Sequence, residues 1–124
     1  MKIERFEDIQ GWQKARELTR MVYEVTKQGA WGTSRDFWLR DQIRDAAGSV
    51  MANIAEGFDA GSDAEFIRFL RYARRSASEV QSHLYIALDQ GYVNQPQFSE
   101  IYQTAEEAKR LIGGFIRYLQ SGRA

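Results

Sequence analysis

Residues 42–57 read QIRDAAGSVMANIAEG, a segment built from apolar, small and polar residues in close alternation. The apolar side chains recur every three or four residues, which is the spacing of an amphipathic helix rather than a strand. Alanine and glycine occupy most other positions, so neighbouring helices can approach closely and we expect this helix at the centre of the fold. Polar side chains beside its buried face then need hydrogen-bond partners.

Four residues of this segment form a candidate polar seam: Ser49, Asn53, Glu56 and Gly57. Asn53 and Glu56 are three residues apart and share one flank of the helix, where we expect both to be at least partly buried. Gly57 stands where a left-handed cap would end the helix. Two interpretations remain open: a structural or assembly seam whose polar groups satisfy one another, and a ligand site.

The same periodicity continues along the chain and predicts four helices, over about residues 8–28, 34–57, 62–91 and 95–120. The chain has one proline, Pro96, as expected of a nearly all-helical protein. The connections are short, which favours antiparallel neighbours. The predicted fold is therefore all-α: an antiparallel, up-down-up-down four-helix bundle with long helices, forming a single domain over residues 1–124.

Several residues at the predicted helix ends support these boundaries. Ser62 and Glu65 match a capping box, in which each side chain binds a backbone N–H of the other residue. Asn94 can cap the last helix, and Gly91 is placed to end the third.

The composition excludes several protein classes. Seventeen basic residues balance seventeen acidic ones, so no net charge draws the chain towards nucleic acid or anionic lipid. There is no cysteine, which rules out disulfides and thiol chemistry. No apolar run approaches the roughly 20 residues that span a bilayer, and MKIERFEDIQ lacks the apolar stretch of a secretory signal. We expect a cytoplasmic protein that does not enter a membrane.

The residues that could carry catalysis form no recognisable arrangement. The one histidine, His83, follows Glu79 by four residues, whereas a di-iron bundle needs Glu-x-x-His on two helices. The glycines match no phosphate-binding pattern, and no serine has an evident base. We expect no catalytic residue, metal or cofactor, and a solvated or hydrogen-bonded His83. An enzyme with a site near Asn53 and Glu56 remains a third alternative.

A basic stripe is predicted on the third helix. By helical spacing, Arg68, Arg71 and Arg75 share one outward face, with Tyr72 beside them and Arg74 at the margin. These residues are a candidate nucleic-acid-binding surface, in which the arginines contact phosphates and Tyr72 stacks on an unpaired base. The alternative is a solvated outer face whose charge is partly neutralised by nearby carboxylates.

Large apolar residues outside the narrow seams of the helices indicate self-association. Leu18, Met21 and Val25 widen the apolar arc of the first helix, and Trp31 and Trp38 add aromatic surface near the first connection. Aromatic side chains are enriched at protein interfaces. The alternative is that they are single surface residues without a role.

Four segments resemble the bacterial four helix bundle proteins, also called 23S rRNA intervening-sequence proteins: FEDIQGWQKARELTRMVYEVTK (6–27), QIRDAAGSVMANIAEG (42–57), DAEFIRFLRYARRSASE (63–79) and LYIALDQGY (84–92). The resemblance implies a four-helix subunit that assembles into a ring-like homopentamer and carries no catalytic residues. It identifies Asn53, Glu56 and Gly57 as fold and assembly residues of the family motif. Some family genes lie inside intervening sequences of 23S rRNA genes. A related branch resembles retroelement accessory proteins, which use basic surfaces to engage nucleic acid and a reverse transcriptase.

The chain departs from the family pattern in three respects. Met51 stands where proline is frequent, so a kink in the second helix is expected to be weaker. Residues 28–38, QGAWGTSRDFW, differ from the usual short turn, and the net charge of zero contrasts with the basic retroelement proteins. The functional prediction is a non-enzymatic, self-assembling module for binding or scaffolding. The alternative is an RNA- or nucleoprotein-binding accessory factor that uses the arginine stripe.

Overall fold

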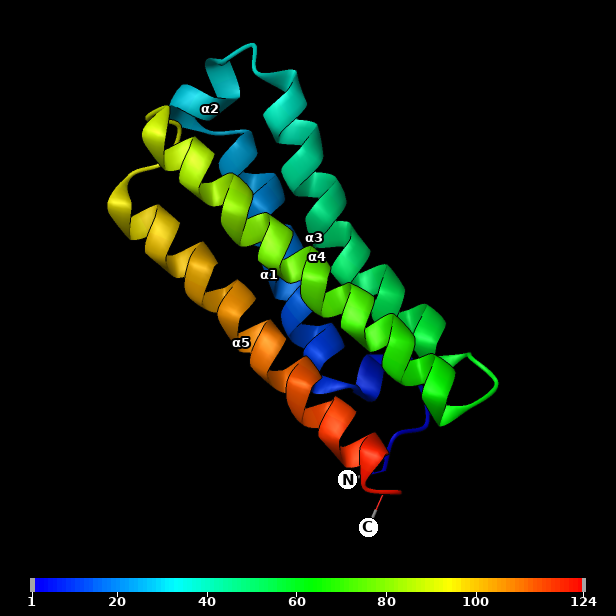
Figure 1. The fold of residues 1–124 in the computed structure, drawn as a ribbon. Helices are drawn as coiled ribbons and strands as arrows, with labels where there is room; N and C mark the ends of the chain where they lie inside the picture. The colour runs from blue at the N-terminus through cyan, green and yellow to red at the C-terminus, as the bar shows by residue number, and fades with distance from the viewer. Residues whose placement is uncertain (1, 124) are drawn as a thin grey trace.

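The computed structural model describes residues 2–123, which form helices and no strand (Figure 1). The elements are η1 (Phe6–Asp8), α1 (Gln10–Thr26), α2 (Gly29–Thr33), α3 (Phe37–Phe58), α4 (Asp63–Asp89) and α5 (Gln95–Gln120). The four long helices, α1, α3, α4 and α5, pack side by side into an elongated bundle, with α2 at one end (Figure 1). The all-α prediction is confirmed.

The first connection differs from the sequence prediction. Helix α1 ends at Thr26, and residues 29–33 form the separate short helix α2. Helix α3 begins at Phe37 because Asp36 is its N-cap, with Asp36 Oδ1 accepting a hydrogen bond from the Leu39 N–H at 3.1 Å. The unusual segment 28–38 therefore folds into an extra helical turn over the end of the bundle.

The predicted caps of the last two helices are largely present. Asn94 and Gln97 form a complete capping box at the start of α5. At the start of α4, Ser62 Oγ accepts from the Glu65 N–H at 3.2 Å, but the Glu65 carboxylate binds Arg68 instead of completing the box. Gly91 follows α4 with a φ of 75°, the left-handed conformation predicted for its end.

Buried side chains form two clusters along the bundle, and each draws on all four long helices. One combines the later halves of α1 and α4 with the earlier halves of α3 and α5. The other combines the earlier halves of α1 and α4 with the later halves of α3 and α5. Removing this apolar surface from water is the main force that holds the helices together.

Several residues that were expected at an interface belong to the core instead. Leu18 and Val25 are buried, Met21 is half-buried, and the Trp31 side chain is 2% exposed. Helix α2 turns Trp31 back over the bundle, where its ring stacks on Tyr92 with centroids 5.7 Å apart. The interface prediction is wrong for these residues, whereas Trp38 remains 61% exposed.

The helices were also compared with the requirements of a bilayer. Within residues 2–123, none of them combines the length and the apolar character needed to cross a membrane.

Candidate functional site

The predicted basic stripe lies on α4, and Arg68, Arg71, Tyr72 and Arg75 are all exposed. Arg68 is neutralised within its own helix, because Arg68 Nη2 lies 2.8 Å from Glu65 Oε2. This hydrogen bond lowers the pKa of the Glu65 carboxyl and raises the pKa of Arg68. Arg68 therefore offers less free charge to a phosphate than the sequence predicts.

The Tyr72 ring is surrounded by cations. The guanidinium of Arg68 lies 5.5 Å from the ring centroid and that of Arg75 lies 5.9 Å away. Arg68 Nη1 also donates to the Tyr72 hydroxyl at 3.1 Å. Cation–π attraction thus holds Tyr72 between two arginines. A base that stacks on Tyr72 would compete with these cation–π contacts.

A second group of arginines lies between α4 and α5. The Nη1 atoms of Arg74 and Arg117 come within 3.4 and 3.6 Å of the position that a Cβ on Gly113 would occupy. Neither arginine forms an ion pair within residues 2–123, and the same holds for Arg71 and Arg75. The structure therefore gathers unpaired positive charge around Arg74, which the sequence placed only at the margin.

Arg117 was missed by the sequence reasoning. It lies on a different helix, 43 positions after Arg74, and no helical spacing relates the two. The available signal was the Gly113–Gly114 pair, two adjacent glycines in the middle of α5. Glycine weakens a helix, so such a pair indicates a place where something must approach the backbone closely.

The polar seam of α3 is partly formed. Asn53 Nδ2 donates to the Ser49 carbonyl oxygen at 2.8 Å and to Ser49 Oγ at 3.0 Å. Across the helix pair, Ser76 Oγ of α4 donates to Ser49 Oγ at 3.1 Å. All three side chains are half-buried. Ser76, which the sequence reasoning missed, is the partner that joins this seam to α4.

The other two predicted seam residues behave differently. Glu56 is exposed and forms no hydrogen bond or ion pair within the described chain, so the expectation of partial burial is wrong. Gly57 does not end the helix, since α3 continues to Phe58. A Cβ on Gly57 would come within 2.8 Å of Phe66 Cδ1, so this residue allows close packing.

The single histidine is also placed differently from the prediction. The His83 side chain is 12% exposed, and neither ring nitrogen has a hydrogen-bond partner within residues 2–123. His83 Nε2 lies 3.4 Å from Glu79 Oε2, but the geometry is not that of a hydrogen bond. The ring of Trp38 meets the imidazole edge to face at 5.9 Å. His83 is thus covered by an aromatic side chain instead of being solvated.

A sequence model of the 23S rRNA-intervening sequence proteins matches residues 7–114 of this chain. The chain belongs to this family. A solved structure agrees: a protein of unknown function from the S23 ribosomal protein family of Bacteroides thetaiotaomicron is 27% identical. The two superpose with a TM-score of 0.76 over 86% of this chain and 97% of the other. A comparison with curated proteins finds no match.

Two of the three departures expected from the pattern of the 23S rRNA-intervening sequence proteins, Met51 and residues 28–38, can be located in the structure. Met51 lies inside an α3 helix that runs without interruption from Phe37 to Phe58. Residues 28–38 contain all of α2, including the buried Trp31. Residues 28–38 therefore add the short helix α2 at the end of the bundle, whereas Met51 leaves α3 continuous.

The acidic residues and the histidine do not converge. Within residues 2–123, no group of three or more His, Asp or Glu side chains is arranged to hold a metal ion. Two of the polar groups that do come together are the Ser49–Asn53–Ser76 seam and the Arg74–Arg117 pair. The first is suited to packing, and the second to binding an anion.

Proposed function

We propose that this family member is a non-enzymatic subunit that self-associates and serves as a binding or scaffolding module. The observation that carries the proposal is the exposed aromatic surface at the start of α3. Trp38 is 61% exposed and Phe37 is 51% exposed. Large aromatic side chains left in water favour association, because they bury much area at little entropic cost.

The partner we propose is a second copy of this chain. Trp38 covers His83 of α4, and Ile86, also exposed, lies one helical turn after His83. The patch therefore spans two helices, which gives it a defined shape. The chain carries no net charge, so copies do not repel one another. The number of five subunits comes from the family resemblance.

The non-enzymatic part of the proposal is supported by the position of His83. Nucleophilic catalysis needs a base within hydrogen-bond reach of the nucleophile. No described side chain forms a hydrogen bond with either ring nitrogen of His83. The cytoplasmic location stays a prediction from composition.

Light scattering at several protein concentrations tests the assembly. We expect one species of about 72 kDa, which is five times the subunit mass of 14.3 kDa. Trp38→Ser should shift the distribution to smaller species. Tyr118→Ser removes another exposed aromatic residue, far along α5, and should leave the mass unchanged. A monomer at every concentration would contradict the proposal.

We also infer that the long helices run up-down-up-down, with sequence neighbours antiparallel. The support is the composition of the two core clusters, in which the later part of α1 meets the earlier part of α3. The same exchange of ends recurs between α3 and α4 and between α4 and α5. Cysteine pairs placed across α1 and α3 would test this. A disulfide between Met21→Cys and a late α3 position would contradict it.

A second candidate function is RNA or nucleoprotein binding. The observation that favours it is a group of exposed arginines on α4 and α5 that form no ion pair within residues 2–123: Arg71, Arg74, Arg75 and Arg117. Guanidinium groups bind phosphate oxygens in pairs, and every neutralised phosphate makes affinity fall with salt. The surface differs from the predicted stripe by gaining Arg74 and Arg117 and by the neutralisation of Arg68.

Titration of single-stranded and stem-loop RNA at several salt concentrations tests this candidate. Arg74→Gln with Arg117→Gln should lower the slope of log affinity against log salt by about 1 to 2. Arg68→Gln, the matched control, should change it less because Arg68 is paired with Glu65. Equal effects of both variants, or no RNA binding at low salt, would contradict the candidate.

A further inference from the structure

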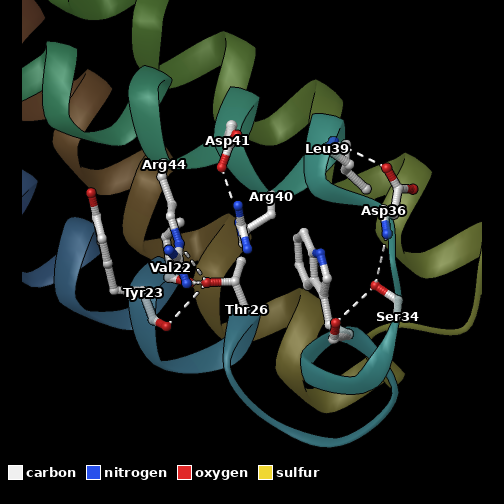
Figure 2. A network of polar contacts seen from close by, with 10 residues as sticks. Val22, Tyr23, Thr26, Ser34, Asp36, Leu39, Arg40, Asp41 and Arg44 are labelled. Atoms are coloured by element: carbon white, nitrogen blue, oxygen red, sulfur yellow. Dashed lines mark hydrogen bonds and ion pairs between the residues drawn. The ribbon is translucent and has the colours of Figure 1, made fainter.

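A polar cavity lies where the end of α1, the helix α2 and the start of α3 meet (Figure 2). Its volume is about 260 Å³. Three cationic side chains, Lys27, Arg40 and Arg44, and one carboxylate, Asp36, line it. The cavity exists because α2 turns across the end of the bundle, so it belongs to the segment in which this chain departs from its family pattern.

Arg44 is held in position beside this cavity. Its Nε donates to Thr26 Oγ1 at 2.9 Å, and its guanidinium lies 4.6 Å from the centroid of the Tyr23 ring (Figure 2). The Nη groups of Arg44 have no protein acceptor within residues 2–123. An arginine fixed through Nε and a ring face keeps its Nη donors available for an anion.

The remaining charges of the cavity are unevenly compensated. Arg40 Nε is paired with Asp41 Oδ1 at 2.9 Å. The Asp36 oxygens already accept hydrogen bonds, from the Leu39 N–H at 3.1 Å and from the Tyr92 hydroxyl at 3.1 Å. Lys27 is exposed and forms no ion pair within the described residues. Lys27 and Arg44 are therefore the cations whose charge is left for a ligand.

The wall of the cavity includes the Trp31 side chain. Trp31 lines the cavity and is buried, yet its Nε1–H has no hydrogen-bond partner within residues 2–123. A buried donor without an acceptor lowers stability by about 1 to 3 kcal/mol. Because this N–H is closed off from solvent, the Trp31 indole serves as a reporter in the cavity wall and is not assigned as a donor to the ligand.

We propose that this cavity binds the phosphate group of a small phosphomonoester. A phosphate presents several acceptor oxygens, which suits separate donors from Lys27 and Arg44 better than a planar carboxylate does. The volume corresponds to roughly nine water molecules, so a phosphate and a small organic group fit together. Phe37 lines the rim and provides apolar contact for that organic group. Phe37 also belongs to the proposed self-association surface, whereas the phosphate-binding cations Lys27 and Arg44 do not.

The indole N–H resonance of Trp31 in ¹⁵N-labelled protein provides the test. Three tryptophans give three indole signals, which substitution of Trp12, Trp31 and Trp38 by Phe assigns. Inorganic phosphate should shift the Trp31 signal saturably, and sodium chloride of equal ionic strength should not. Phenyl phosphate should bind several-fold more tightly than phosphate, and Phe37→Ala should remove that gain.

Charge variants decide whether the cavity is the site. Arg44→Gln should weaken phosphate binding about tenfold or more. Lys27→Gln, which removes no contact to the protein, should weaken it by a smaller factor with the fold intact. Arg20→Gln, an exposed residue of α1 outside the cavity, is the matched control and should leave the affinity unchanged.

Three results would overturn the proposal. The first is a shift that sodium chloride reproduces, and the second is equal binding by the Lys27→Gln and Arg20→Gln variants. The third comes from a short 5′-phosphorylated RNA, which carries the same group from another source. If that RNA binds through Lys27 more tightly than phenyl phosphate does, and its 5′-hydroxyl form does not, the small-molecule assignment is wrong.

Discussion

The two ends of the bundle are closed in opposite ways. At the end where α3 passes into α4, Gly57 has no side chain, and a Cβ there would lie 2.8 Å from Phe66 Cδ1 and 2.9 Å from Phe69 Cβ. At the other end, the largest side chain of the protein core, Trp31, comes from α2 and stacks on Tyr92. One end is closed by direct helix contact at Gly57, which has no side chain, and the other end is covered by the large side chain of Trp31.

The two kinds of closure have different consequences for packing and for ligand binding. Close packing at Gly57 brings two helices into direct contact and leaves no room between them. Insertion of Trp31 covers the core but requires a separate piece of chain, and the charged cavity lies between that piece and the long helices. A cavity of about 370 Å³ also lies near the Gly57 end, but its charged residues Asp63 and Arg123 pair with each other. We therefore expect stability to be sensitive at both ends, and anion binding to concentrate at the Trp31 end.

Trp31→Ala tests how much the Trp31 side chain stabilises its end of the bundle, and it should have the largest effect on stability. Loss of a buried tryptophan typically lowers the free energy of unfolding by about 3 to 5 kcal/mol. Trp31→Phe retains an aromatic ring and removes an N–H that has no partner, so it should lower stability by clearly less. Urea unfolding followed by circular dichroism measures both. Equal losses for Ala and Phe would show that the ring packing contributes little.

Gly57→Ala tests whether the close packing of α3 on α4 requires a residue without a side chain at position 57. The added methyl group must displace Phe66 or Phe69, and we expect unfolding free energy to fall by about 1 to 3 kcal/mol. Gly48→Ala in the same helix is the matched control, because nothing lies within 4 Å of its Cβ position. It should raise stability by about 0.5 to 1 kcal/mol through helix propensity. A shared sign for both variants would refute the close-packing role of Gly57.

The Ser49–Ser76 hydrogen bond joins α3 and α4 between the two ends of the bundle, so it tests how much a polar contact stabilises the middle of the helix pair. In a double-mutant cycle with Ser49→Ala and Ser76→Ala, we expect a coupling energy of about 0.5 to 1.5 kcal/mol. Ser49→Ala also removes the hydrogen bond from Asn53 Nδ2 to Ser49 Oγ, but this loss is common to the single and the double variant and cancels in the coupling energy. Additive single effects would mean that the hydroxyl pair does not stabilise the seam.

Alkaline titration gives the smallest expected effect and reports on the Trp31 end alone. Burial, and then the hydrogen bond to Asp36, raise the pKa of Tyr92 above its ordinary value of 10.0. The pKa of Tyr92 is higher in the folded state than in the unfolded state. The contribution of Tyr92 to the free energy of unfolding is therefore present below pH 10 and is lost as pH rises through the folded-state pKa.

Unfolding free energy measured between about pH 8 and pH 11.5 checks this sign. The unfolding free energy of the Tyr92→Phe variant should fall less steeply with pH than that of the wild type. The Tyr118→Phe variant, changed at an exposed site, should follow the wild-type slope. A wild-type slope in the Tyr92→Phe variant would mean that the phenol of Tyr92 does not contribute.

Much of this protein follows from local patterns in its sequence. The spacing of apolar residues predicts four long helices and their buried faces, and Ser62, Asn94 and Gly91 mark helix ends correctly. The segment 42–57 was expected to pack closely and to hold a partly buried Asn53 with polar partners, and the hydrogen bonds from Asn53 to Ser49 confirm this expectation for Asn53. These features depend on residues within one or two helical turns of each other, where helix geometry alone determines which side chains are neighbours.

The remaining features were decided by the tertiary structure. Nothing local distinguishes Trp31, which is buried, from Trp38, which is exposed, because the difference depends on where α2 folds back. Arg74 meets Arg117, and Ser49 meets Ser76, across helices that are far apart in sequence. Helical periodicity gives the direction of a side chain about its own axis, but the neighbour that stands opposite is set by the packing of all the helices together.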